Sequence, residues 1–298
     1  MLACSLTSSP ALPASPAGPT PAPVVQAART SAPTPVPALT VDQLKNAQYQ
    51  LVYRDSHSTI QLTDGVYQNG NNTVSPDYAD VTLVKQMAFG DLNGDGVGDA
   101  AVLLAENYGG TGVFVSVLAM INQNGRAVQA AAEMIDDRPV INSISIKDGQ
   151  IYLDAVTHGP NDPGCCAAQP VKQAYRFVGG KLVFTSISMK TANGLERVIT
   201  IDSPADGTSA SWPLTISGRV TVAPFENNLL YAVFDADNNE LKQGSFLVKA
   251  DQPGSPGTFS LPLDLGTRVT GPLRIQIEDS SPADGSILAL GSVTVNIK

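Results

Sequence analysis

The 298-residue sequence is poor in charge and in the side chains that most often carry out chemistry. Charged residues make up 15% of the chain, with 18 Lys and Arg against 27 Asp and Glu, which gives a net charge of −9. There are two histidines, one tryptophan and three cysteines. A surface short of positive charge repels polyanions, so we expect no nucleic acid and no anionic lipid surface as a partner.

Long apolar runs and familiar catalytic motifs are also missing. No stretch approaches the roughly 20 consecutive apolar residues that a membrane-spanning helix needs. There is no Gly-x-Ser-x-Gly elbow, no His-Glu-x-x-His and no paired-carboxylate motif in a strand context. We therefore expect no enzyme activity. The alternative is an exported hydrolase acting on cell-wall glycan or peptide, with carboxylates assembled from distant positions.

What the chain does contain favours short strands and tight turns. Hydrophobic residues make up 43% of the sequence, and 26 glycines and 22 prolines punctuate it. A chain of this length can bury the cores of two modest domains. The sequence therefore predicts a mainly β protein.

The most informative motif runs from Asp91 to Asp99, between two apolar runs. Oxygen-bearing side chains recur at every second position of a glycine-rich stretch. Alternate positions of a tight loop can bring several oxygens to one point, as Ca²⁺ requires, with one ligand supplied by a backbone carbonyl. The predicted calcium ligands are Asp91, Asn93, Asp95, the Val97 carbonyl and Asp99.

Other interpretations of this stretch can be compared with the calcium site. A helix-loop-helix site needs a bidentate glutamate at the twelfth loop position, where this chain has Val102. The stretch instead resembles the strand-loop-strand calcium turns of FG-GAP and integrin-type propeller repeats, whose last ligand matches Asp99. A hydrated hairpin turn is the alternative, because Asn, Gly and Asp also favour turns. A phosphate-binding loop is disfavoured, since a phosphate would meet three carboxylates and no lysine.

The first residues resemble the end of a bacterial lipoprotein signal. In Met1-Leu-Ala-Cys4, a leucine and a small residue precede a cysteine, which in such proteins becomes lipidated and N-terminal. The apolar segment that normally comes before it is missing, so we expect an upstream start or a shortened chain. A Ser/Pro/Ala-rich tract follows, and residues 1–39 are predicted to form a lipobox-like start and a disordered tether. The resemblance implies an extracytoplasmic lipoprotein at the bacterial cell surface, attached to the membrane only through a lipid on Cys4.

Residues 40–190 are predicted to form an antiparallel α+β domain that carries the calcium-type turn. Thr40 is a suitable N-cap for a short helix. Asn124-Gly125, Asp148-Gly149 and Gly179-Gly180 are hairpin signals between strand-like segments. The predicted strands cover residues 60–62, 81–89, 100–105, 113–121, 140–147, 151–157, 171–178 and 182–188.

Four stretches of this region resemble a family of exported bacterial domains with no assigned activity. They cover residues 90–104, 109–114, 137–140 and 158–166. The resemblance implies a compact exported fold and names no substrate.

Cys165 and Cys166 are adjacent. Outside the cytoplasm they can close a vicinal disulfide, stay reduced or pair between chains. His158, Asp154 and Asp162 lie nearby in sequence, so a thiol–imidazole pair is a further alternative. The simpler interpretation is a cysteine pair that rigidifies a loop rich in Pro and Gly.

Residues 197–298 are predicted to form an immunoglobulin-like β-sandwich, because short alternating strands recur between turn signals. The sandwich has no cysteine pair, so packing must hold its sheets, and we expect Trp212 and Phe225 to pack in the core or at a sheet edge. The order of motifs, including Phe225-Glu-Asn-Asn-Leu229 and Asp284-Gly-Ser286, resembles the GerMN-associated immunoglobulin-like domain of bacterial spore germination. That resemblance implies an envelope location and recognition of a protein or glycan.

These features together predict a non-enzymatic envelope lipoprotein that presents β-rich binding or structural domains at the cell surface. The predicted cofactor is Ca²⁺, and the predicted partner is an envelope protein or glycan. A periplasmic chaperone or inhibitor shares this fold and is not separated from it by the sequence.

Overall fold

The computed structural model describes residues 36–54, 58–71, 73–266 and 269–298. Strands account for 59% of the described residues and helices for 3%, so the mainly β prediction is confirmed. No helix among the described residues combines the length and the apolar character that crossing a membrane requires. Cys4 and most of the predicted tether lie outside the described residues.

The elements of the first part of the chain run from a short helix to a long series of strands. They are α1 (Val41–Lys45), β1 (Gln48–Gln50), β2 (Thr59–Gln61), β3 (Val66–Asn69), β4 (Ala79–Gly90), β5 (Asp99–Asn107), β6 (Phe114–Gln123), β7 (Arg126–Asp137), β8 (Val140–Lys147), β9 (Gln150–Thr157), β10 (Gln169–Val178), β11 (Lys181–Lys190) and β12 (Glu196–Arg197).

The second part contains strands and a single turn of 3₁₀-helix. Its elements are β13 (Ile199–Ser203), β14 (Ser209–Ala210), β15 (Leu214–Val220), η1 (Phe225–Asn227), β16 (Asn228–Phe234), β17 (Glu240–Leu247), β18 (Lys249–Ala250), β19 (Gly257–Leu263), β20 (Gly271–Ser280) and β21 (Ile287–Ile297).

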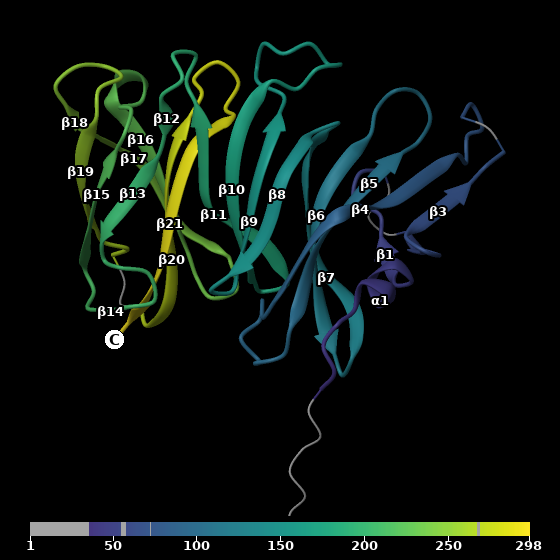
Figure 1. Ribbon diagram of the computed structural model, residues 1–298. Helices are drawn as coiled ribbons and strands as arrows, with labels where there is room; N and C mark the ends of the chain where they lie inside the picture. Colours follow the sequence, from purple (N-terminus) through teal and green to yellow (C-terminus); the bar gives the residue numbers. More distant parts are fainter. Residues whose placement is uncertain (1–35, 55–57, 72, 267–268) are drawn as a thin grey trace, which may run out of the picture. The chain divides into compact units, whose positions relative to one another are not determined.

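The strands form four sheets (Figure 1), with the orders β1-β2, β3-β4-β5-β6-β7, β13-β15-β19-β18 and β17-β16-β20-β21-β11-β10-β9-β8. In the largest sheet, β21 from the end of the chain pairs antiparallel with β11, with Ile187 opposite Leu290. Residues 36–298 form one compact unit. The strands on either side of the predicted boundary at residues 190–197 therefore share one sheet.

Helix α1 begins as the sequence indicated. The Thr40 hydroxyl accepts a hydrogen bond from the Gln43 backbone N–H at 3.2 Å, and the Gln43 side chain accepts one from the Thr40 N–H at 2.9 Å. This reciprocal capping box satisfies two N–H groups that the first turn of a helix leaves without partners. The side chain of Leu44 is completely buried against the sheet that α1 covers.

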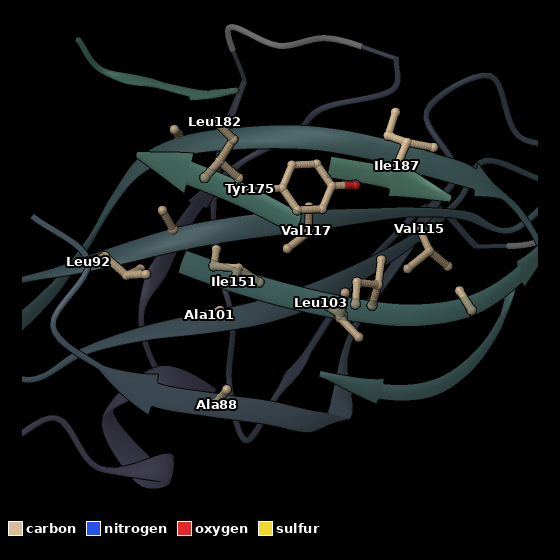
Figure 2. Close-up of a cluster of buried hydrophobic side chains, with 14 of the residues drawn as sticks. Ala88, Leu92, Ala101, Leu103, Val115, Val117, Ile151, Tyr175, Leu182 and Ile187 are labelled. Carbon is tan, nitrogen blue, oxygen red and sulfur yellow. The ribbon is translucent and has the colours of Figure 1, made fainter. Parts of the chain in front are cut away.

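Strand β5 is buried on both faces, which explains its uninterrupted apolar run. Ala101 and Leu103 belong to a cluster that faces the strands β8 to β11, and Figure 2 shows Leu103 in this cluster with Ile151 and Tyr175. Ala100, Val102 and Leu104 alternate with them and face α1, β1 and β2. The five-stranded sheet is thus the middle layer of three.

The C-terminal region is a two-sheet sandwich around a separate core. Buried side chains of β13, β15 and β19 pack in one cluster with those of β16, β20 and β21. Trp212 packs against this cluster, as expected. Phe225 does not: its side chain is 65% exposed on η1, where the chain turns through the left-handed residue Glu226. The expectation of packing was wrong for Phe225.

Candidate functional site

The predicted calcium residues lie on the turn that joins β4 to β5. Asp91 is the first of them, and its two carboxylate oxygens accept hydrogen bonds from the backbone N–H groups of Gly94 at 2.7 Å and Gly96 at 2.9 Å. Gly94 and Gly96 have φ of +80° and +81°, a backbone conformation that glycine adopts at little cost. The glycines of the motif therefore let the chain curl around the Asp91 carboxylate.

Asn93 and Asp95 continue the same curl on the exposed side of the turn. The Asn93 side-chain oxygen accepts from the Asp95 N–H at 3.0 Å, and the Asp95 carboxylate accepts from the Val97 N–H at 2.7 Å. The Asn93 amide also donates to the other Asp95 oxygen at 3.0 Å. The structure thus places the side chains of Asn93 and Asp95 in contact.

Asp99 is buried, whereas Asp91, Asn93 and Asp95 are exposed or partly exposed. Its side chain is completely buried, and its oxygens accept from the backbone N–H of Leu92 at 2.9 Å and of Asn122 at 2.8 Å. Asn122 lies at the end of β6, so this one carboxylate links the turn to two strands. Asp99 therefore holds the base of the turn in place.

The turn carries negative charge at neutral pH. Burial acts to raise the pKa of Asp91, but hydrogen bonds from the backbone N–H groups of Gly96 and Gly94 outweigh it and lower that pKa below its ordinary value. The side chains of Asp91, Asn93, Asp95 and Asp99 and the Val97 carbonyl are the groups that could hold a cation. Among the described residues, no group of three or more His, Cys, Asp or Glu side chains is arranged as a metal site. Calcium binding by this turn stays a prediction.

The two cysteines lie in the exposed loop between β9 and β10, where a disulfide joins Cys165 to Cys166. Asp162 closes the loop, because one of its oxygens accepts from the Gly159 N–H and from the Ala168 N–H, each at 2.8 Å. These two hydrogen bonds lower the pKa of Asp162. The loop is thus fixed by a carboxylate at its neck as well as by the sulfur bond.

His158 does not form the thiol–imidazole pair that the sequence left open. Its Nδ1 lies 2.9 Å from an Asp136 carboxylate oxygen, and its Nε2 is buried with no hydrogen-bond partner in the described part of the chain. Asp154 is held elsewhere, where it accepts from the Asn142 side chain at 2.7 Å. The residues around the cysteines therefore form separate contacts and no common catalytic set.

The sequence did not predict a hollow that lies over the strands β8 to β11. It has a volume of about 350 Å³, and its lining includes the polar residues Tyr152, Asp154, Lys172 and Glu196. Tyr152 and Asp154 both lie on β9, but Lys172 and Glu196 are distant from them in the chain, and the four form no motif. The only local signal is the alternation of serine with isoleucine in β8 and β11, which puts small side chains on one face of each strand.

Comparison with known proteins begins with two weak or negative results. No curated protein matches the chain. Among solved structures, the extracellular domain of a one-component system from B. thetaiotaomicron is similar at 10% identity and a TM-score of 0.21, over 70% of this chain and 36% of that one. The protein therefore spans little more than a third of that structure.

The family comparison is specific to the C-terminal region. The matched residues are 198–286, from the start of β13 to the turn that follows β20. Strand β21 lies beyond the match and completes the sandwich. The predicted resemblance of this region is confirmed: residues 198–286 match the immunoglobulin-like domain of bacterial spore germination.

Proposed function

We propose that the protein is a non-enzymatic binding module of the bacterial envelope, located outside the cytoplasm and stiffened by Ca²⁺ at the turn between β4 and β5. A lipid on Cys4 would attach it to a membrane. The immunoglobulin-like match over residues 198–286 supports a bacterial module built for presentation of β-sheet surfaces.

The observation that carries the proposal is the packing of oxygens on the β4–β5 turn. Asp91, Asn93 and Asp95 fall on alternate positions of a short exposed loop, and the side chains of Asn93 and Asp95 touch at 3.0 Å. The carboxylates of Asp91, Asp95 and Asp99 fall within nine residues of the chain, and carboxylates gathered on one turn repel one another unless a cation neutralises them. Calcium sites of extracellular modules often have dissociation constants of about 10⁻⁴ to 10⁻³ M.

Asp99 gives this turn a second role in the proposal. Each of its oxygens accepts one backbone hydrogen bond and keeps a further lone pair that a cation can use. An ion held by Asp91 and Asp99 together would connect the exposed turn to the buried base of β5 and β6. Binding to the folded state alone would stabilise it by about 2.7 kcal/mol when Ca²⁺ is at 100 times its dissociation constant.

The test is a thermal and calorimetric titration with Ca²⁺, after treatment with EDTA. The wild-type melting temperature should rise as Ca²⁺ is added, and calorimetry should show one site. Asp95→Asn should abolish both effects because it removes a ligand charge. Asp251→Asn is the matched control, since Asp251 is exposed in the loop between β18 and β19 of the C-terminal region and should leave calcium binding unchanged.

The result that overturns the calcium proposal is a melting temperature unaffected by Ca²⁺ with no heat of binding. The stretch would then be a hydrated hairpin turn. The anchor is tested separately by detergent phase partitioning of the protein expressed with its natural upstream codons. The wild-type chain should enter the detergent phase and Cys4→Ser should stay in the aqueous phase; equal partitioning of the two would exclude a lipid on Cys4.

A further inference from the structure

The outer face of β8 to β11 has a floor of small side chains. Ser143 lies opposite Asp154, which lies opposite Lys172, which lies opposite Ser188. The next row across the same strands is Ser145, Tyr152, Ala174 and Ser186. Serine and alanine leave room above the sheet, so the longer side chains of Tyr152, Asp154 and Lys172 stand around an open space.

The segment that leads into the C-terminal sandwich forms the wall of this space. Glu196 reaches back over the sheet, where one of its oxygens accepts from the Lys172 ammonium and from the Ser188 hydroxyl, both at 2.9 Å. At Gly291 a Cβ atom would lie 2.7 Å from the Ile199 carbonyl oxygen, so the absence of a side chain lets β13 cross close to β21. The segment that contains Glu196 and β13 is therefore held in a fixed position over the outer face of β8 to β11.

The space consists of two hollows that share Asp154, Lys172, Ser188 and Glu196 in their linings. The larger, of about 350 Å³, includes Tyr152, Ser186, Val198 and Leu290 in its lining. The smaller, of about 230 Å³, extends toward Asn142 and Lys190, and both hollows include Lys172. Ligand pockets span roughly 300–1,000 Å³, so the pair suits a small or short extended ligand.

The charges around the hollows balance. Asp154 and Glu196 are matched by Lys172 and Lys190, and the hydrogen bond from Lys172 lowers the pKa of Glu196, with Lys190 adding to the effect. An ionic ligand would have to displace these contacts and gains no net attraction.

Several hydroxyl groups around the larger hollow are free to bind. Within the described ranges of the chain, no hydrogen bond occupies the side chains of Tyr152, Ser143 or Ser186, and the Tyr152 side chain is 38% exposed. An aromatic ring beside hydroxyl and carboxylate oxygens offers an apolar face and a polar rim together. Sugar rings present the complementary pattern of C–H faces and hydroxyl edges.

We propose that this pair of hollows binds a neutral oligosaccharide, with Tyr152 stacking on a sugar ring and Asp154, Ser143 and Ser186 hydrogen-bonding its hydroxyls. The inference rests on the proposed function in that it names a ligand class for the binding module. Glu196 accepts hydrogen bonds from Lys172 and Ser188, so in this proposal it holds the wall of the site, and the site binds the sugar without cleaving it.

The test is calorimetric titration with two neutral probes, cellotriose and triacetylchitotriose, in Ca²⁺ and again in EDTA. At least one probe should bind the wild-type protein. Tyr152→Ala should weaken that binding about tenfold, and Tyr152→Phe should retain the stacking part of the affinity. Ser186→Trp fills the larger hollow from an exposed position and should abolish binding. Val140→Ser changes an exposed side chain of β8 outside the hollows and serves as the control.

Several outcomes overturn the inference. They are the failure of both probes to bind, affinity that survives Ser186→Trp, tighter binding of inorganic phosphate or of tetraglycine, and release of shorter sugars during the titration. Failure here is distinguishable from failure of the calcium proposal, because Ca²⁺ binding is read from the metal titration and Asp95→Asn leaves the hollows intact. If the protein binds sugar in EDTA and shows no Ca²⁺ binding, the sugar proposal stands and the calcium proposal fails.

Discussion

The two regions of the protein satisfy their buried charges in different ways. In residues 36–190 the buried carboxylates of Asp99 and Glu106 accept hydrogen bonds from backbone N–H groups. In residues 198–298 the buried charges of Asp279 and Arg274 are met by side chains. The first arrangement connects loops to strands through the backbone, and the second connects side chains to one another, as where Arg197 of β12 meets Asp279 of β20.

The N-terminal arrangement uses one carboxylate to hold two segments. Glu106 is completely buried on β5 and accepts from the Val52 N–H at 2.9 Å, far away in sequence. It also accepts from the Tyr108 hydroxyl. Asp99 acts in the same way at the other end of β5. Removing either carboxylate would take these acceptors away from N–H groups that are buried or partly buried.

The C-terminal arrangement is pairwise. Asp279 receives the Arg197 guanidinium at 2.6 Å. Arg274 is only 7% exposed, donates to Asn238 at 2.6 Å and to Gln276 at 2.8 Å, and lies 3.9 Å from the centre of the Phe234 ring. Burial lowers the pKa of Arg274 to about 10. When one side chain of such a pair is removed, a second substitution that neutralises the other side chain can restore part of the lost stability. A carboxylate bonded to backbone N–H groups has no such second substitution, because the backbone donors remain.

The largest effect is expected from Asp99→Ala. It leaves the N–H groups of Leu92 and Asn122 buried without acceptors, at about 1–3 kcal/mol each, so we expect a loss of about 4 kcal/mol in the free energy of unfolding. Urea denaturation in EDTA measures it without any contribution from calcium. Asp95→Ala is the control and should cost less than about 0.5 kcal/mol, because Asp95 is exposed. Equal losses for the two variants would contradict the role assigned to Asp99.

The next largest effect is expected from Arg197→Ala in the C-terminal region. Breaking a buried pair from one side costs about 3–5 kcal/mol, and because Arg197 is partly exposed we expect about 3 kcal/mol. Arg197→Ala combined with Asp279→Asn should recover part of the loss. If the double variant were less stable than Arg197→Ala, neutralising the remaining partner would not compensate for the loss, and the proposed difference between the two regions would be wrong.

The pH dependence of Arg197→Ala sharpens the same comparison. Burial raises the pKa of Asp279, and Arg197 opposes that increase. Without Arg197 the folded-state pKa rises further above the unfolded value of about 3.9, so the folded state takes up a proton more readily. The variant should therefore recover stability relative to the wild type as the pH falls from about 7 toward 4. Urea denaturation across this range measures it, and a constant difference would contradict the assignment.

A smaller pair of effects concerns close packing between strands. A Cβ atom at Gly218 would overlap the Thr200 carbonyl oxygen and the Phe259 ring, whereas at Gly90 it would lie 2.5 Å from the Ile146 Cγ2. We expect Gly218→Ala to cost about 2–3 kcal/mol and Gly90→Ala about 1 kcal/mol, because a side chain on the edge strand β8 can shift and a paired backbone cannot.

Chemical denaturation of both glycine variants gives the ranking. Gly164→Ala is the control, since no atom lies within 4 Å of a Cβ placed there. If Gly90→Ala lowered the free energy of unfolding more than Gly218→Ala did, the packing of Gly90 against β8 would be less able to adjust than the packing of Gly218 in the sandwich, contrary to this expectation.

Prediction from sequence worked where a local pattern decides the structure. The apolar run in β5 indicated a strand, although its burial on both faces depends on layers that lie elsewhere in the chain. Strand β7 was not predicted, because its Ala-rich sequence has a low strand propensity. Pairing with β6 and the small size of Ala131, which lets the layers approach, override that propensity.

The candidate sites follow the same division. The β4–β5 turn is local, so the alternating oxygens and glycines located it correctly between two strands. The hollows over β8 to β11 depend on register, which brings Tyr152, Lys172 and Glu196 together across four strands and a connecting segment. Residues brought together by strand register have no fixed spacing in the sequence, so no motif could have predicted the hollows.

The smallest effect is expected from removing the cysteine pair. A bond between adjacent residues closes almost no chain, so it removes little entropy from the unfolded state. The loop is also closed by Asp162, which accepts from the N–H groups of Gly159 and Ala168. Cys165→Ser with Cys166→Ser should therefore change the free energy of unfolding by less than about 0.5 kcal/mol, while Asp162→Ala should cost more, because it removes the acceptor of both hydrogen bonds. Urea denaturation with and without reductant gives both values. A larger loss from the cysteines than from Asp162 would mean that the sulfur bond holds this loop, against the use of backbone-bonded carboxylates elsewhere in the N-terminal region.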